Sequence, residues 1–246
     1  TQGNRVYVWE VDSPYRPGIM EWPMYRHDPL RTGKYSPPCI TPTDGMVIEE
    51  DIILCRGEHR LDNGIQIGSD NVSITCEGTV LNGQRAITGS AGISTLDHDN
   101  LEINNCTITN YTIGIDMDGS VANHSDSVLI KNNRFYSNGN NQNWGGTAVD
   151  MVWNEDVTIE DNFLFRNSIH SQESQNLTIN NNNIFLGMIS ILANQTDVSN
   201  NVIINNFVNS NIGNAIWAVD SDADSPDDYY YSGNFAWNTM GTENNP

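Results

Sequence analysis

The sequence lacks long apolar runs and has few basic residues. Its longest apolar stretch, IFLGMISILA, is about half the length of a transmembrane helix, so we expect no membrane insertion. Lysine and arginine together number 11 against 31 aspartates and glutamates, which gives a formal net charge of −20. Such an acidic chain is a poor partner for nucleic acid and for anionic membrane surfaces. Its charge favours solubility and cation binding.

Common catalytic motifs are also missing. The sequence contains no G-x-S-x-G, no H-E-x-x-H and no phosphate-binding loop, which removes the usual signatures of serine hydrolases, zinc peptidases and nucleotide-binding enzymes. Its 4 cysteines show no C-x-x-C spacing, so a zinc or redox motif is not expected. They permit three disulfide pairings. All fall early in the chain, where they would staple one end of the fold: Cys39, Cys55, Cys76 and Cys106.

Asparagine, by contrast, is abundant, and several asparagines start N-x-S/T sequons. Some of these sequons arise by chance in so asparagine-rich a chain. Their number nevertheless indicates a glycosylated surface, and together with the cysteines it predicts a protein secreted to the cell surface. The sequons begin at Asn71, Asn105, Asn110, Asn123, Asn176 and Asn194.

A short template recurs along most of the chain. It reads apolar, any, apolar, any, any, Asn or Cys, any, apolar, and a second short apolar strand usually follows each copy. The alternation has a period of two residues, and no segment keeps a helical period over a useful length, which excludes helical repeats. The clearest copies are LEINNCTI (101–108), VLIKNNRF (128–135), VTIEDNFL (157–164) and LTINNNNI (177–184), with looser copies at 196–203 and 229–236.

Short strands that recur at intervals of roughly 20 to 30 residues predict a coil of parallel strands. Successive turns of such a coil stack about 4.8 Å apart, so equivalent residues form columns. Amides stacked in a buried column can satisfy one another's donors and acceptors. The predicted column contains Cys106, Asn133, Asn162, Asn182, Asn201 and Asn234.

The segment from CITPTDG at residue 39 to TVLNG at residue 83, followed by NLEINNCTITNYTIGI (100–115), resembles a known family. It is similar to the right-handed parallel β-helix proteins of the pectate-lyase-like superfamily, and more closely to the secreted prokaryotic group with NosD-type repeats. The resemblance covers about residues 39–240. It implies an all-β fold: a single-stranded right-handed parallel β-helix, a solenoid, over 39–246 after an N-terminal arm at 1–38.

The resemblance also implies disulfides Cys39–Cys55 and Cys76–Cys106, with the second joining adjacent turns. Stacking of Cys55 with Cys76, which share a C-x-G context, is the alternative. For function the resemblance says little, because the same fold hosts lyases, hydrolases, epimerases, adhesins and phage spikes.

The N-terminal arm carries two further signals. WPMYRHDPLRTG (22–33) resembles the segment that introduces quinoprotein-type β-propeller repeats in secreted prokaryotic proteins, but no propeller follows. NRVYVWEV (4–11) is apolar on both faces and therefore expects cover on both sides.

The arm pairs either with its own coil or with a neighbouring subunit's open edge. The ends of a coil are unpaired β edges, and head-to-tail contacts that do not close give filaments. We therefore expect a homo-oligomer assembled through the coil ends or through the arm residues Val6, Tyr7, Val8, Trp9 and Val11.

Catalytic candidates are sparse. Lyases of this fold, as the resemblance implies, abstract a sugar proton with Arg or Lys while Ca²⁺ on carboxylates neutralises the uronate. Lys131 and Arg134, with Asp116 and Asp118 one turn earlier, form the best such arrangement, against the simpler interpretation of solvated surface charges.

Glycosidases instead need two carboxylates roughly 5–10 Å apart. The NTD, DD, GHG and RIK motifs of the polygalacturonase-like branch are absent. His98 and His124 lie in polar bends without a partner at a metal-ligand spacing, so we interpret them as solvated. The carboxylates that could serve are Asp97 with Asp99, Asp116 with Asp118, and Asp150 with Glu155 and Asp156.

DSDADSPDD (220–228) resembles a D-x-D-x-D calcium loop, in which carboxylates at alternate positions wrap one Ca²⁺. Ser225 replaces the usual glycine and no glutamate closes the loop, so a plain acidic insertion is the alternative. Ca²⁺ is the one cofactor to which the sequence points. Its ligands would be Asp220, Asp222, Asp224 and Asp228.

Three functions remain after these exclusions. The leading hypothesis is a secreted structural protein of the cell surface, a self-assembling subunit of a filament, sheath or adhesin. The alternatives are a carbohydrate-active enzyme, either lyase or glycoside hydrolase, and a carbohydrate-binding module that takes glycans as partners. For the module, the stacking faces would come from Trp144, Trp153, Trp217 and Trp237.

Overall fold

The computed structural model describes residues 38–84, 89–95, 97–119, 124–139 and 146–199, with the strands at 202–205, 216–219, 229–232 and 235–238. The chain divides into two compact units, Thr1–Pro38 and Cys39–Pro246. The described residues contain no helix, and so no helix that could cross a membrane. The predicted assembly residues lie outside the described part of the chain: Val6, Tyr7, Val8, Trp9 and Val11.

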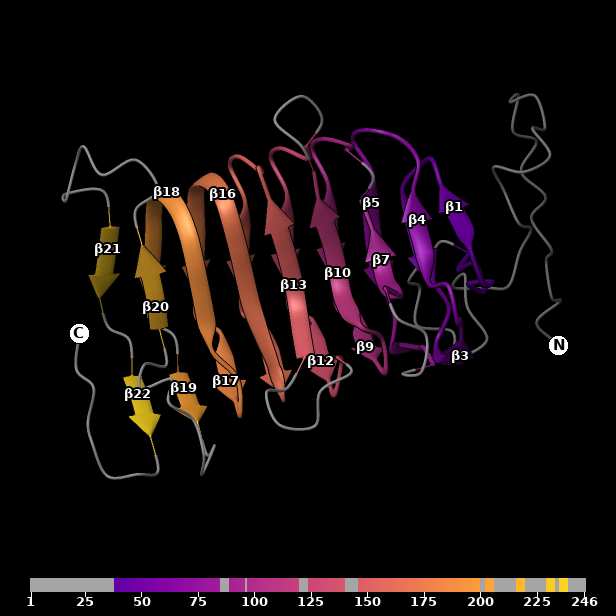
Figure 1. Cartoon of the computed structure of the whole chain (residues 1–246). Helices are drawn as coiled ribbons and strands as arrows, with labels where there is room; N and C mark the ends of the chain where they lie inside the picture. The colour runs from indigo at the N-terminus through magenta and orange to yellow at the C-terminus, as the bar shows by residue number, and fades with distance from the viewer. Residues whose placement is uncertain are drawn as a thin grey trace, which may run out of the picture. The chain divides into compact units, whose positions relative to one another are not determined.

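The second unit consists of short strands in two parallel sheets of 14 and 8 strands (Figure 1). We name three faces by the place of each strand within its turn. Face A contains β1 (Met46–Ile48), β4 (Ile65–Ile67), β7 (Ala91–Ser94), β10 (Ile113–Asp118), β13 (Gly146–Val152) and β20 (Ile216–Val219). Face B contains β2 (Ile52–Leu54), β5 (Ser73–Cys76), β8 (Glu102–Asn104), β11 (Leu129–Lys131), β14 (Thr158–Glu160) and β21 (Tyr229–Ser232). Face C contains β3 (Gly57–Arg60), β6 (Thr79–Asn82), β9 (Thr107–Thr109), β12 (Arg134–Tyr136), β15 (Phe163–Phe165), β17 (Asn183–Phe185), β19 (Val202–Asn205) and β22 (Phe235–Asn238).

The long strands β16 (Asn167–Asn180) and β18 (Ile189–Ser199) run through face A and on into face B. Every strand pairs in parallel with the equivalent strand of the next turn. On face A, for example, the register runs Ile93, Ile115, Val149, Ile169, Ile189. The chain is therefore a right-handed parallel β-helix, as the repeat predicts.

Alternate side chains of each strand point into the tube and fill it with stacked aliphatic and aromatic groups. Inward side chains at the same position of successive turns form columns. Each side chain in these columns is almost fully buried, and burying a side chain of this size contributes about 1.5–3 kcal/mol. A turn therefore depends on its neighbours to cover its apolar side chains. The face B column is Ile74, Ile103, Ile130, Ile159 and Ile179, and the face C column is Leu81, Ile108, Phe135, Leu164 and Ile184.

The bends between faces explain the abundance of asparagine. At the bend from face B to face C, one residue of each turn has a positive φ: Asn105, Asn132, Asp161 and Asn181, with values of 59°, 57°, 57° and 53°. Asparagine and aspartate adopt this left-handed conformation more readily than other residues with a side chain. The bend from face A to face B also has one residue with a positive φ in successive turns: Asn71, Asn100, Ser127, Asp156 and Asn176.

The predicted asparagine column is present at the B–C bend. The Oδ1 of Asn133 accepts the N–H of Cys106 at 2.9 Å, that of Asn162 accepts the N–H of Asn133 at 2.8 Å, and that of Asn182 accepts the N–H of Asn162 at 3.0 Å. Each Nδ2 in turn donates to a main-chain carbonyl of the preceding turn. The amides thus bind mainly the backbone of the turn before, rather than chiefly one another. The other predicted members, Asn201 and Asn234, lie outside the described residues.

Polar side chains are buried at the other bends too, which the template does not predict. Asn138 accepts the N–H of Tyr111 at 3.1 Å, at the bend from face C to face A. At the A–B bend, the hydroxyls of Thr95 and Ser125 lie 2.8 Å apart, and Asn154 donates to the carbonyl of Ser125 at 3.1 Å. Each of the three kinds of bend therefore contains buried, hydrogen-bonded polar groups in the middle turns of the described chain.

Both disulfides have the pairing that the resemblance implies, Cys39–Cys55 and Cys76–Cys106. Cys76 ends β5 and Cys106 occupies the B–C bend of the next turn, so this bond joins neighbouring turns across 30 residues of chain. The described part of the chain contains no free cysteine. Disulfides of this kind persist in oxidising compartments.

Candidate functional site

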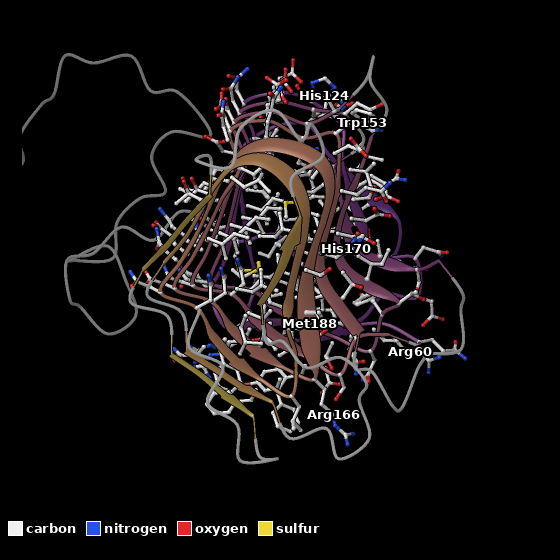
Figure 2. All side chains as sticks on the ribbon, turned by 60° about the vertical axis from the view of Figure 1, so that its left-hand side comes forward. Arg60, His124, Trp153, Arg166, His170 and Met188 are labelled. Carbon is white, nitrogen blue, oxygen red and sulfur yellow. A yellow bond between two sulfur atoms is a disulfide. The ribbon has the colours of Figure 1, made fainter. Side chains whose placement is uncertain are left out.

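The outward side of face A carries a line of ionisable side chains. Asp116 on β10 is in register with Asp150 on β13, which is in register with His170 on β16. Asp118 lies two residues beyond Asp116 on the same edge of β10. We call these residues the carboxylate–histidine row: Asp116, Asp118, Asp150 and His170. Figure 2 shows His170 on the side of the tube, apart from His124 and Trp153 at the top.

Strand alternation places the row outside the tube. In GIDMDG the inward residues are Ile115 and Met117, 0% and 1% exposed, so the two aspartates point outward. Val149 and Met151 of β13 are fully buried on either side of Asp150. The row is therefore built on packed strands rather than on loops.

A short hydrogen bond joins two members of the row. The Nδ1 of His170 lies 2.7 Å from the Oδ1 of Asp150. This bond raises the pKa of His170, although partial burial opposes the increase, so His170 keeps its proton to higher pH than an ordinary histidine. The Asp150 side chain is 19% exposed and that of His170 is 43% exposed.

The pKa values of the other two carboxyls, Asp116 and Asp118, are raised above that of an ordinary aspartate. Partial burial raises the pKa of Asp116, and the charge of Asp150 adds to this, against the N–H of Asp118 that Asp116 accepts at 3.1 Å. Partial burial also raises the pKa of Asp118, with the charges of Asp116 and Asp150 acting in the same direction and His170 opposing them. Neighbouring acids with different environments are the usual basis of acid–base catalysis.

Glycoside hydrolysis needs one protonated carboxyl and one carboxylate on either side of the bond to be broken. The backbones of neighbouring parallel strands are about 4.8 Å apart, so the outward side chains of Asp116 and Asp150, which are in register, are direct neighbours. Asp116 would serve as the acid. Asp150, which His170 orients, would serve as the carboxylate.

The other predicted acid pairs do not assemble into such a site. Asp99, Asp126 and Glu155 lie at the A–B bend, where each carboxylate accepts a hydrogen bond from the next turn. Asp97 and Asp156 are bend residues with positive φ, 64° and 55°. These acids connect successive turns rather than flank a common substrate position.

The predicted lyase arrangement is wrong, because its members lie on different faces. Asp116 belongs to face A, Lys131 to face B and Arg134 to face C. Lys131 forms an ion pair with Glu102 at 3.1 Å. Period-2 alternation shows which side chains point outward, but it does not show which face carries them.

The two histidines that we interpret as solvated each lie beside an aspartate, and the predicted Ca²⁺ loop is outside the described residues. His98 lies 3.0 Å from the Oδ1 of Asp70, and His124 lies 3.4 Å from the Oδ1 of Asp126, both at the A–B bend. Within the described ranges, no group of His, Cys, Asp and Glu residues has the arrangement of a metal site. The Ca²⁺ loop stays a prediction, because its carboxylates lie outside the described residues: Asp220, Asp222, Asp224 and Asp228.

The N-x-S/T sequons coincide with the residue order that the bends of this fold favour. A left-handed bend favours asparagine, an inward apolar residue comes next, and an outward Thr or Ser begins the strand. The exposed examples are Asn71, Asn105 and Asn176. Asn110 is half-buried and donates its Nδ2 to Asn82 at 2.8 Å. Asn123 lies outside the described residues and Asn194 lies within β18, so glycosylation stays a prediction at all six.

Sequence reasoning missed His170. His170 lies in NSIHSQ (167–172), a segment that no copy of the template covers. Only the alternation of Ile169 with its polar neighbours indicates that the His170 side chain points outward. The four tryptophans do not share one face. Trp217 lies on β20 in face A and Trp237 on β22 in face C, while Trp153 follows β13 and Trp144 is outside the described residues.

No protein-family model and no curated protein matches this sequence. Among solved structures, the chain is similar to PfbA, a surface adhesin of Streptococcus pneumoniae, with 13% identity over 83% of this chain and 72% of that chain and a TM-score of 0.42. It is also similar to the Agl-KA catalytic domain, with 12% identity over 78% of this chain and 39% of that chain and a TM-score of 0.38. Similarity at this level carries no argument for function. The NosD-type and pectate-lyase-like assignments stay expectations.

Proposed function

We propose that this chain is an extracellular cell-surface protein that acts on carbohydrate, with glycoside hydrolysis at the carboxylate–histidine row as its chemistry. The observation that carries the proposal is the register of Asp116, Asp150 and His170 on adjacent strands. Asp116 protonates the leaving oxygen, because its raised pKa lets it keep a proton to higher pH than an ordinary aspartate. Asp150, which His170 positions, takes a proton from the water whose oxygen bonds to the anomeric carbon as the glycosidic bond breaks.

Two further observations favour a sugar substrate. The register of the row continues from His170 to Ser190 on β18, so the line of polar outward residues extends by a further turn, and hydroxyl groups hydrogen-bond with sugars. A flat parallel sheet also presents its outward residues in an evenly spaced line, which suits a chain-like ligand. The extracellular location rests on the two disulfides and the exposed sequon asparagines.

The proposal is tested by incubating the purified protein with a panel of neutral and acidic polysaccharides and measuring the release of reducing ends. We expect release from at least one polysaccharide, and no release above background by the Asp150→Asn variant. Equal release by the variant and the wild-type protein would show that the hydrolysis does not depend on the row.

A second candidate function is structural, as a self-assembling subunit. One observation favours it: β1 forms the open edge of face A, with β4 as its described partner. Val47 is 50% exposed there and Ile40 is 46% exposed. A hollow of about 460 Å³ lies beside them, lined by Ile40 and residues 46–52. An unpaired apolar edge is a site for strand addition by another subunit.

Negative-stain electron microscopy of the full chain tests this second function. We expect filaments from the wild-type protein and few or none from Val47→Lys, because a charge on the open edge opposes strand addition. Thr158→Lys, which places the same charge on the middle of face B, serves as the control and should form filaments normally. Particles of a single subunit at high protein concentration would rule out self-assembly.

A further inference from the structure

Face C carries aromatic side chains on its outward surface. The inward residues of β12, β15 and β17 are Phe135, Leu164 and Ile184, each fully buried, so their neighbours point away from the tube. Three successive turns place an aromatic ring there. We call these residues the aromatic strip: Tyr136, Phe163, Phe165 and Phe185.

The rings of the strip form a continuous surface. The ring centroids of Tyr136 and Phe163 are 5.7 Å apart, and those of Phe163 and Phe185 are 5.4 Å apart. Phe165 is 37% exposed, in line with Tyr136 and Phe185 in the register. The corresponding outward positions of the preceding turn are polar, at Thr107 and Thr109 of β9. The tube is already filled from inside, so the strip has no role in its core.

The strands that carry the aromatic strip and those beside them hold no acidic residue. Strands β6, β9, β12, β15 and β17 contain no aspartate or glutamate, in a chain with 31 of them. Arg134 lies beside the strip, in register with Phe163, and Arg166 directly follows Phe165. Both are exposed, and Figure 2 shows Arg166 pointing away from the tube.

Neither of these arginines forms an ion pair with a described residue, whereas Lys131 pairs with Glu102 and Arg60 with Asp62. Two guanidinium groups beside aromatic rings, on strands that themselves carry no carboxylate, are complementary to a sugar ring with a negative charge. Guanidinium binds carboxylate through paired hydrogen bonds, and the apolar face of a pyranose ring packs on an aromatic ring.

We propose that the aromatic strip with Arg134 and Arg166 is a binding site for an acidic polysaccharide containing uronic acid. The rings of the strip pack against the sugar rings, and the two guanidinium groups pair with uronate carboxylates. This site lies on a different face from the carboxylate–histidine row and does not rest on the proposed hydrolysis. It would hold the protein on an acidic glycan surface whether or not the row is catalytic.

Affinity electrophoresis of the full chain tests the site, with polygalacturonate in the gel and its fully methyl-esterified form as the uncharged probe. We expect retardation by polygalacturonate and little by the ester. In Arg134→Gln/Arg166→Gln the affinity should fall by about tenfold or more, because both charge-assisted contacts are lost. Phe163→Ala should weaken binding to both probes.

The matched control is Arg60→Gln, which removes an exposed arginine of face C that already pairs with Asp62, and its retardation should equal that of the wild-type protein. Circular dichroism checks that each variant is folded. Absence of retardation, equal retardation by both probes, or an unchanged Arg134→Gln/Arg166→Gln variant would overturn the proposal. Sedimentation that showed a dimer abolished by Phe163→Ala would assign the strip to a second copy of the chain and would also overturn it.

Discussion

Replacement of Asn162 by alanine is expected to lower the free energy of unfolding by about 3–5 kcal/mol, because it leaves two buried main-chain groups without partners. The Asn162 side chain is 1% exposed. Its Oδ1 accepts the N–H of Asn133 at 2.8 Å, and its Nδ2 donates to the carbonyl of Ile130 at 2.9 Å and to Asn182 at 3.0 Å.

Urea unfolding followed by circular dichroism measures this loss, with Asn183→Ala as the matched control. Asn183 belongs to the same run of asparagines, but it is exposed on face C, so its replacement should change stability by only about 0.5 kcal/mol or less. Similar losses in the two variants would mean that the asparagine column does not stabilise the fold as described.

Replacement of Asp116 by asparagine is expected to lower kcat/KM for glycoside hydrolysis by about a hundredfold or more, since it removes the proton donor. The pH profile should change as well. Burial raises the pKa of Asp116, and the general acid must be protonated, so wild-type activity should fall as pH rises through this raised pKa. The decline should therefore begin at a higher pH than an ordinary aspartate would give. This alkaline limb should be missing from the residual activity of Asp116→Asn.

Glu160→Gln is the control for this experiment. Glu160 lies on β14, in the same turn as Asp150 but on face B, and the substitution removes the same kind of charge. Its rate and pH profile should match those of the wild-type protein. An alkaline limb that persisted in Asp116→Asn would assign the proton donor to another residue.

Much of the fold could be predicted because its determinants are local. In LTINNNNIFL the alternation places Leu177, Ile179 and Ile184 inside the tube, and all three are buried there. Asn182 is buried in the column, as the template predicts. Asn180 ends β16 and Asn183 begins β17, so Asn181, with a φ of 53°, and Asn182 make the turn.

The candidate site could be predicted only in part, because it depends on the register between turns. Asp116 and Asp150 meet although a whole turn, with β11 and β12, separates them in the sequence, and the length of such a turn does not show which residues will pair. The same limitation misplaced Lys131 and Arg134, which alternation places outside the tube but on different faces. The aromatic strip likewise becomes visible only once β12, β15 and β17 are aligned.

The most direct measurement of the central claim compares the initial rates of hydrolysis for Asp116→Asn, Asp150→Asn and the variant that carries both substitutions. Residues that act as one catalytic unit lose little more when both are removed than when one is. We expect each single variant to lose most of the activity and the double variant to be no slower than about the slower of the two. Independent, multiplicative losses, or rates that stay at the wild-type level, would contradict the assignment of hydrolysis to this row.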